Sequence, residues 1–316
     1  MVAMLYYIKF TVVCCIMLLF TISIFITFTN IKIILYNSPT PIVIWHGMGD
    51  SCYAPGINSI KQLLEDKISG VYVKCIHKGN NIFVDIEKSY LGNINNDVEV
   101  VCKEIEMDVN LQNGYNAIGL SQGAQFLRAV AERCTTPPML NLISFGGQHQ
   151  GVFGLPHCIA INNEMCNFFR QLLSSAAYTN FVQESIIQAG YWHDSTKTDE
   201  YKNKSRFLAD INNELNINET YKSNLKKLKS LVLVMFENDT IVQPKETGWF
   251  GFYKPGQSVE LESLQESSLY KEDRLGLQEM DKLGKIHFIS LEGDHLQFTE
   301  EWQIHILAKV QVILQR

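Results

Sequence analysis

The chain has 316 residues, of which 46% are hydrophobic and 19% charged, and its formal net charge is −6 at pH 7. This length allows a large core, either in one domain with an insertion or in two domains. The sequence has no basic block or Arg-rich stretch, which argues against a nucleic acid as partner.

The first 36 residues differ from the rest of the chain. No charged residue occurs between Lys9 and Lys32, and residues 10–28 are almost wholly apolar. Such a stretch could span a bilayer, and no clean A-x-A cleavage site follows it. We interpret residues 1–36 as a secretory signal, with an uncleaved signal anchor as the alternative. Both interpretations send residues 38–316 into the secretory pathway and allow membrane contact only through this segment.

From residue 38 onward, strand patterns and helix patterns alternate, which predicts an α/β fold with a mostly parallel sheet. Residues 146–229 break the alternation: they are rich in Asn, Gln, Tyr and Phe, and we expect a mostly helical insertion. The strands are predicted at 41–45, 71–76, 115–118, 140–145, 230–236 and 285–291, and the helices at 57–68, 95–111, 122–134 and 300–314.

The sequence Gly119-Leu-Ser121-Gln-Gly123 stands between a predicted strand and a predicted helix. A Ser flanked in this way by Gly is typical of a nucleophile elbow, in which a sharp turn presents the Ser Oγ. The following helix directs its N-terminal N–H groups at the site. The alternative is a Gly-rich turn in which Ser only caps the helix.

A serine nucleophile needs a base and an orienting acid, and in α/β hydrolases the chain order is Ser, acid, His. Asp239 follows a clear strand and is the predicted acid, with Glu237 as the alternative. Of the eight histidines, only His295 lies in a loop directly after the last strand, so it is the predicted base. His287 is expected within that strand, as a core or sheet-face residue.

Two backbone N–H groups should stabilise the oxyanion. One is that of Gln122, which follows the nucleophile. The other is that of Met48 in His46-Gly-Met-Gly, where glycines free the backbone to turn inward. An ordinary Gly-rich loop supported by His46 is the alternative.

Six cysteines follow the first segment, an even number that suggests disulfides in an exported chain. The sequons at Asn203, Asn218 and Asn238 agree with export. No Cys/His spacing indicates zinc, and we expect neither a metal nor a cofactor.

Several long runs resemble the palmitoyl-protein thioesterases, lysosomal enzymes that remove long-chain fatty acyl groups from cysteine. These runs cover nearly everything after residue 40. They are Val43-Ile-Trp-His-Gly-Met-Gly-Asp-Ser-Cys52, Gly114-Tyr-Asn-Ala, Ser121-Gln-Gly, Gln125-Phe-Leu-Arg-Ala-Val, Gly146-Gly-Gln-His-Gln-Gly-Val-Phe-Gly-Leu-Pro156, Tyr191-Trp-His-Asp194, Trp249-Phe-Gly-Phe-Tyr253, Asp273-Arg-Leu-Gly-Leu277 and Glu292-Gly-Asp-His-Leu-Gln297.

The resemblance implies an α/β-hydrolase fold whose insertion at 146–229 forms much of the fatty-acyl groove. It implies the triad Ser121, Asp239 and His295, with Met48 and Gln122 as oxyanion donors. It also implies disulfides Cys102–Cys134 and Cys158–Cys166, glycosylation at the three sequons and a lysosomal location.

The implied substrates are S-palmitoylated proteins or peptides and palmitoyl-CoA-like thioesters. One departure concerns Cys52-Tyr53, where the family can have two adjacent cysteines. Here Cys52 could bond the additional Cys75, or either could be a free thiol. A lipase or esterase acting on oxygen esters, and a non-catalytic lipid-binding homologue, remain as alternative functions.

Overall fold

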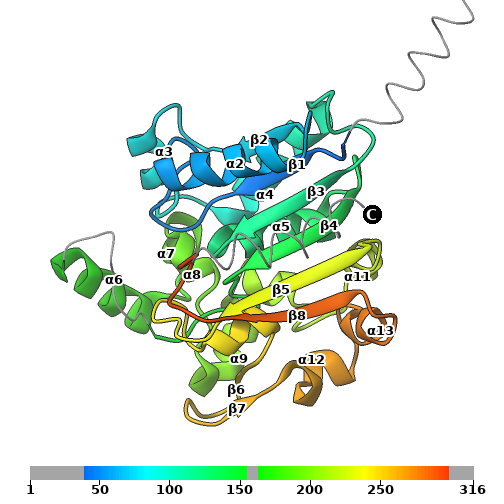
Figure 1. The fold of residues 1–316 in the computed structure, drawn as a ribbon. Coiled ribbons are helices and arrows are strands. Elements are labelled where there is room, and N and C mark those ends of the chain that lie inside the picture. The colour runs from blue at the N-terminus through cyan, green and yellow to red at the C-terminus, as the bar shows by residue number, and fades with distance from the viewer. Residues whose placement is uncertain (1–38, 155–162, 299–316) are drawn as a thin grey trace, which may run out of the picture. The chain divides into compact units, whose positions relative to one another are not determined.

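The computed structural model describes residues 39–154 and 163–298, and residues from Thr40 onward belong to one unit (Figure 1). The predicted signal segment at 1–36 and the predicted closing helix at 300–314 lie outside the described residues. Both remain predictions.

A six-stranded parallel sheet forms the centre of the fold, with strand order β2-β1-β3-β4-β5-β8 (Figure 1). Every neighbouring pair is parallel, and the central strands are buried along almost their whole length. This explains why they read as continuous apolar runs. The strands are β1 Ile42–Trp45, β2 Val73–Ile76, β3 Tyr115–Leu120, β4 Met139–Phe145, β5 Ser230–Phe236 and β8 Ile286–Leu291, which confirms the predicted α/β class.

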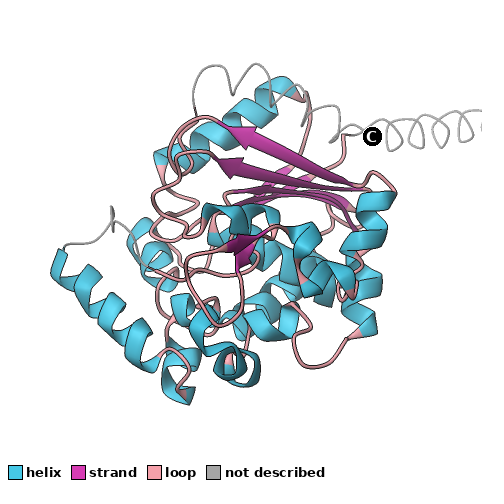
Figure 2. Cartoon of the chain, turned by 90° about the horizontal axis from the view of Figure 1, so that it is seen from below, coloured by secondary structure: helices cyan, strands magenta, loops and turns pink. Residues whose placement is uncertain are grey.

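Each face of the sheet has its own apolar core, because successive strand residues point to opposite faces. On one face, Ile42 and Ile44 pack in a cluster with residues of α2 (Pro55–Lys67). On the other face, Trp45 packs in a cluster with residues of α4 (Ile94–Met107) and α5 (Gln122–Arg133). Helices therefore lie on both sides of the sheet, as Figure 2 shows.

Short helices fill the chain between β4 and β5, as predicted for residues 146–229. Buried side chains such as Ile187 and Phe207 join the core on the α5 side, so the insertion is part of the fold and not a separate domain. The helices are α6 Asn163–Ala176, α7 Asn180–Ser185, α8 Ile187–Gly190, η1 Ser195–Lys197, α9 Thr198–Lys204, α10 Leu208–Ile211 and α11 Glu219–Leu225.

Several short elements were not predicted. Helix α3 (Ile82–Lys88) begins at Asn81, whose side chain accepts hydrogen bonds from the amides of Phe83 and Val84. Seven residues are too few to give a helical period. Between β5 and β8 lie η2 Lys245–Trp249, a hairpin of β6 Phe252–Tyr253 and β7 Leu261–Glu262, η3 Leu264–Glu266, α12 Ser268–Lys271 and α13 Leu277–Lys282.

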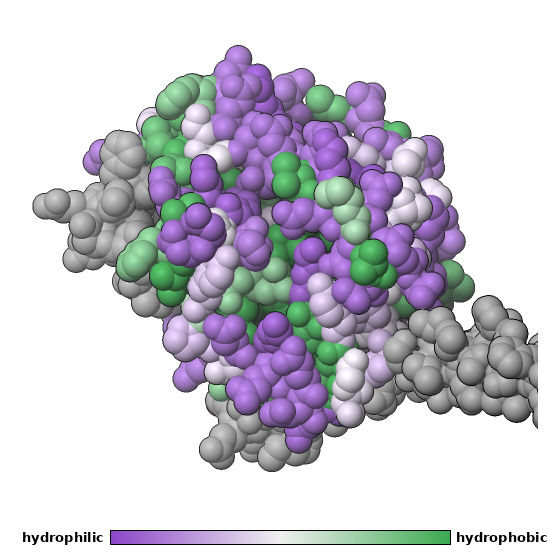
Figure 3. Space-filling view, turned by 90° about the horizontal axis from the view of Figure 1, so that it is seen from above, coloured by the Kyte–Doolittle hydropathy of each residue, from purple (hydrophilic) through white to green (hydrophobic). Residues whose placement is uncertain are grey.

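The face shown in Figure 3 is mostly hydrophilic, and hydrophobic side chains appear in a hollow near its centre. Elsewhere, large apolar side chains are exposed at scattered positions such as Phe83, Val109 and Val259. Among the described residues, none of the helices combines the length and the hydropathy needed to cross a bilayer.

Candidate active site

The predicted site residues all follow strands of the parallel sheet. Because the carboxyl ends of parallel strands meet at one edge, this topology gathers the loops after β1, β3, β4, β5 and β8 there. This edge is the usual location of a site in an open α/β sheet.

Ser121 adopts the strained conformation expected of an elbow. Its φ of 53° and ψ of −123° lie between the end of β3 and the start of α5. Such a positive φ is uncommon for a residue with a side chain. A Cβ on Gly119 would lie 2.1 Å from the Ala124 Cα, and one on Gly123 would lie 2.2 Å from the Trp45 carbonyl oxygen. Only Gly at both positions permits this turn.

Asp239 and His295 form a close pair at the ends of β5 and β8. Asp239 Oδ2 lies 2.6 Å from His295 Nδ1, and both side chains are largely buried. Asp239 Oδ1 accepts hydrogen bonds from the amides of Ile241 and Val242, at 2.9 and 2.8 Å. The carboxylate is thus fixed by its own loop. The alternative acid, Glu237, is exposed and accepts a hydrogen bond from Ser290 instead.

Asp294 joins the loop of Asp239 to the loop of His295. Its Oδ1 accepts hydrogen bonds from the amides of Thr240 and His295, at 2.8 and 2.7 Å. The Thr240 hydroxyl donates to the same carboxylate at 3.0 Å. Sequence reasoning gave Asp294 no role, although it stands beside His295 in the Glu292-Gly-Asp-His run.

The ring of His295 lies close to the residue after β4, and β4 is the neighbour of β3, the strand that leads to Ser121. A Cβ on Gly146, the residue after β4, would be 2.9 Å from His295 Cε1. The Ser121 amide donates a hydrogen bond, at 2.8 Å, to the carbonyl of Phe145, which precedes Gly146. The predicted base and the predicted nucleophile are therefore both anchored at the end of β4.

The loop after β1 packs against the nucleophile. A Cβ on Gly47 would lie 3.1 Å from Ser121 Cβ and 3.8 Å from Ser121 Oγ. Met48 follows in a turn, and Gln122 is the first residue of α5 and almost fully buried. The two predicted oxyanion donors thus belong to backbone segments that flank Ser121.

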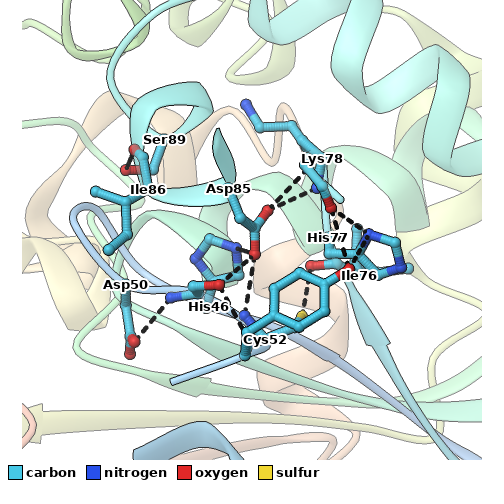
Figure 4. A network of polar contacts seen from close by, with 12 residues as sticks. His46, Asp50, Cys52, Ile76, His77, Lys78, Asp85, Ile86 and Ser89 are labelled. Atoms are coloured by element: carbon cyan, nitrogen blue, oxygen red, sulfur yellow. Dashed lines mark hydrogen bonds and ion pairs between the residues drawn. The ribbon is translucent and has the colours of Figure 1, made fainter. Parts of the chain in front are cut away.

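A second histidine–carboxylate pair supports this loop (Figure 4). His46 and Asp85 of α3 are almost fully buried, and His46 Nε2 lies 3.3 Å from Asp85 Oδ2, close but not well aligned for a hydrogen bond. Asp85 Oδ1 accepts a hydrogen bond from the Lys78 amide at 2.7 Å. Burial alone raises the pKa of Asp85, but the contact with His46 and the Lys78 hydrogen bond outweigh it, so this pKa lies well below its ordinary value.

Three other histidines among the described residues lie in the core or in the sheet. His149 is fully buried, and its Nε2 lies 2.8 Å from Ser144 Oγ. His193 stacks between Tyr201 and Phe252, and burial lowers its pKa to about 4. His287 lies within β8, as expected for a sheet residue.

Comparison with known proteins decides the family. The palmitoyl protein thioesterase model matches residues 41–295. The Palmitoyl-protein thioesterase 1 of Caenorhabditis elegans is 53% identical over 270 residues, which cover 85% of this chain and 90% of that protein. The chain belongs to the palmitoyl-protein thioesterase family. The Palmitoyl-protein thioesterase 3 of Dictyostelium discoideum is 34% identical over 266 residues, which cover 84% of this chain and 88% of that protein.

Two disulfides brace the thioesterase fold within the described residues. Cys102–Cys134 joins α4 to the residue after α5, which confirms the bond implied by the family resemblance. Cys52–Cys75 joins the loop after β1 to β2, so the sequence departure at Tyr53 is accompanied by a bond and not by free thiols. Cys158 and the side chain of Cys166 lie outside the description, and their bond remains a prediction.

The Cys52–Cys75 bond also decides the status of one cluster of potential metal ligands. His46, Cys52 and Asp85 place ligand atoms within 4.8 Å of one another. The Cys52 sulfur is already bonded to Cys75, so this cluster offers no thiolate to a metal ion.

The three sequons of this thioesterase-family chain are accessible. Asn203, Asn218 and Asn238 are all exposed. Accessibility is necessary for glycosylation, and the modification itself remains a prediction.

Proposed function

We propose that the chain hydrolyses long-chain fatty acyl thioesters, above all palmitoyl groups on cysteine, through a serine acyl-enzyme. The observation that carries the proposal is the 2.6 Å pair of Asp239 and His295 in a chain of this family. The pair lies near the end of β4, where the Ser121 amide is also hydrogen bonded. Ser121 is the proposed nucleophile, His295 the base and Asp239 the orienting acid.

The chemistry takes two steps. His295 Nε2 accepts the Ser121 proton while Oγ attacks the thioester carbonyl. The tetrahedral intermediate expels the thiolate, which takes the proton from His295 and leaves as a thiol. Water then gives a proton to His295 and attacks the acyl-enzyme carbonyl. When this second tetrahedral intermediate collapses, His295 returns the proton to Ser121 Oγ, and the fatty acid leaves. Asp239 holds Nδ1 of the ring and stabilises the imidazolium in both steps.

The developing oxyanion is the proposed ligand of the Met48 and Gln122 amides. Both segments flank Ser121, and the Gln122 amide lies at the first residue of α5, where the helix dipole favours negative charge. Donors fixed before the reaction stabilise the transition state without reorganisation.

The proposed substrates are S-palmitoylated proteins or peptides and palmitoyl-CoA-like thioesters. Each buried CH₂ of the acyl chain contributes about 0.8 kcal/mol, so a C16 tail offers roughly 10 kcal/mol before the cost of lost freedom. The helices of residues 146–229 are the proposed source of the acyl-binding surface. No metal or cofactor takes part in this proposal.

We further propose that the chain enters the secretory pathway and works in the lysosome, with residues 1–36 as its signal or anchor. Two disulfides among the described residues fit an oxidising route of export. The exposed sequons fit the same route.

Hydrolysis by the Ser121→Ala variant tests the proposal. We expect wild-type protein to release palmitate from palmitoyl-CoA and from an S-palmitoyl peptide, and the variant to lose this turnover while its melting temperature stays within a few degrees. Turnover retained by Ser121→Ala would exclude Ser121 as the nucleophile. Turnover absent even from folded wild type would favour a non-catalytic lipid-binding homologue.

A matched pair of substrates separates the remaining alternative. The S-palmitoyl peptide and its O-palmitoyl serine counterpart differ only in the leaving atom. A thiolate leaves with less protonation than an alkoxide, so we expect the thioester to react faster. A faster oxygen ester would identify the chain as a lipase or esterase.

A further inference from the structure

Ser89, the residue after α3, contacts both sides of the proposed oxyanion site. It is fully buried. Its hydroxyl accepts a hydrogen bond from the Gly49 amide at 2.8 Å and donates to the Ile86 carbonyl at 2.6 Å. Gly49 directly follows Met48, so this hydroxyl fixes the backbone of the loop that carries one proposed donor.

The carbonyl of Ser89 holds the other side. It accepts hydrogen bonds from Gln122 Nε2 and from Gln188 Nε2, each at 3.1 Å. The other end of the Gln122 side chain, Oε1, accepts from the Tyr191 hydroxyl at 3.0 Å. Gln122 is therefore held at both polar atoms, by Ser89 and by a residue of the insertion.

Asp85, one turn earlier on α3, secures the flanks of the same loop. It lies beside His46 and accepts hydrogen bonds from the Ser51 hydroxyl at 2.8 Å and the Cys52 amide at 3.0 Å. Figure 4 shows this helix segment, with Asp85 and Ser89, beside the loop. The loop is thus attached to α3 before, within and after its glycines.

We infer that Ser89 is a positioning residue of the oxyanion hole, which sets the Met48 and Gln122 amides relative to each other before substrate binds. The inference rests on the proposed function. Ser89 does not touch the reacting atoms: it acts through the Gly49 amide and the Gln122 side chain. Loss of the Ser89 hydroxyl should therefore weaken stabilisation of the transition state much more than binding of the substrate.

A purely structural role for Ser89 can be separated from positioning, because the chain contains a matched residue. Ser267 is also buried, its hydroxyl donates to the carbonyl three residues earlier (Leu264, 2.6 Å), and it accepts from a backbone amide (Tyr270, 3.3 Å). It lies on the connection between η3 and α12, and its hydrogen bonds go to neighbouring residues of that connection, within 263–271. Ser267→Ala is therefore the control: it removes a buried hydroxyl with the same kinds of hydrogen bonds, at a position away from the proposed oxyanion site.

The test compares Ser89→Ala, Ser267→Ala and wild type in three measurements. These are kcat and KM for palmitoyl-CoA, the affinity for a palmityl trifluoromethyl ketone, which forms an oxyanion when Ser121 adds to it, and the affinity for palmitate. For Ser89→Ala we expect kcat and ketone affinity to fall together by about tenfold to a hundredfold, with KM and palmitate affinity within about twofold. Ser267→Ala should lower the melting temperature similarly and leave all four parameters within about twofold.

Ketone affinity and kcat within twofold of wild type in folded Ser89→Ala would overturn the inference. If that variant does not fold, Ser89→Cys decides, since it keeps a side chain of similar size and replaces the hydroxyl that accepts from the Gly49 amide with a weak acceptor. A several-fold parallel fall of kcat and ketone affinity supports the inference, and unchanged values overturn it. Turnover by Ser121→Ala would instead refute the proposed function, whereas an inactive Ser121→Ala with an unaffected Ser89→Ala refutes only the positioning role.

Discussion

Two histidine–aspartate pairs lie at the same edge of the sheet, and they differ in which ring nitrogen of the histidine faces the carboxylate. In the His295–Asp239 pair, one ring nitrogen, Nδ1, binds the carboxylate at 2.6 Å, and the pair lies on loops after β5 and β8. In the His46–Asp85 pair, Nδ1 lies 2.9 Å from the Gly47 carbonyl and Nε2 lies 3.3 Å from the carboxylate. In His46, Nδ1 is hydrogen bonded to the Gly47 carbonyl and Nε2 faces the Asp85 carboxylate without an aligned hydrogen bond. In His295, Asp239 uses only Nδ1, and Nε2 is the proposed proton acceptor.

The two pairs also differ in the groups that hold their carboxylates. Asp239 accepts hydrogen bonds from amides of its own loop, whereas Asp294 accepts from His295 beside it and from Thr240 on the loop of Asp239. Asp85 is fully buried and binds groups on the β1 and β2 loops at once. A histidine–carboxylate pair is therefore not by itself a sign of catalysis. The role proposed for His295 depends also on the Ser121 elbow near the end of β4.

The largest expected effect is on rate, at the first pair. Asp239→Asn should lower kcat by about 10⁴-fold, because Asn favours the wrong tautomer of His295. Its melting temperature should change little. Glu237→Gln is the matched control, two residues away and exposed, and should keep kcat within about threefold. Steady-state hydrolysis of palmitoyl-CoA measures both, and the reverse ranking would make Glu237 the acid.

At the second pair, we expect the main effect on stability. Asp85→Asn removes the charge of a buried pair and leaves several donors without an acceptor, so the free energy of unfolding should fall by about 3 kcal/mol. Denaturant unfolding measures this fall. A loss of less than about 1 kcal/mol would show that the network around Asp85 contributes little to folding.

The pH dependence of stability should sharpen the contrast. The unfolded chain has an Asp pKa of about 3.9, and that of folded Asp85 is lower. Ionised Asp85, which faces His46 and Lys78 with Asp50 nearby, therefore stabilises the fold above about pH 4, and this contribution is lost as the pH falls through the folded pKa.

The difference in unfolding free energy between wild type and Asp85→Asn should accordingly be constant above about pH 5 and narrow below about pH 4. Urea unfolding at a series of pH values measures it. A difference that narrows between about pH 5 and pH 8 would assign the effect to another titrating group.

The smallest effect on rate is expected at Asp294, which joins the loop of Asp239 to the loop of His295. Asp294→Asn keeps an oxygen at Oδ1, which accepts the amides of Thr240 and His295, and removes only the charge. We expect kcat to fall by about threefold to tenfold, with KM and stability nearly unchanged. A loss as large as that of Asp239→Asn would give Asp294 a direct part in proton transfer.

The sequence sufficed for the parts of the site that follow strands in a fixed order. Ser121, Asp239 and His295 each come directly after an apolar run, and hydrolase topology gives the order. Asp85 and Ser89 could not be found in this way. Their partners in the loop lie 34 and 40 residues away in sequence, so only the fold brings them together.

The short elements could not be predicted from the sequence, and the pairing of Cys52 with Cys75 could only be named as one possibility, for related reasons. Helix α3 is defined by its cap at Asn81 and by contacts with the β1 loop, and not by an apolar period. The Cys52–Cys75 bond depends on the closeness of the β1 loop and strand β2, which spacing alone does not reveal. The close contact of Asp239 with His295 agrees with the prediction, and the roles of these residues and of Ser121 stay proposals until the variants are measured.

The last residue of the Asn238 sequon is Thr240, which also connects the loop of Asp239 to the loop of His295. Thr240, which an attached sugar would require, binds Asp294 through its amide and its hydroxyl. Replacing Thr240 to remove the glycosylation sequon would therefore also remove a hydrogen bond between these two loops. A carbohydrate-free enzyme should be engineered by replacing the exposed Asn238 itself, so that an altered rate can be attributed to the missing sugar.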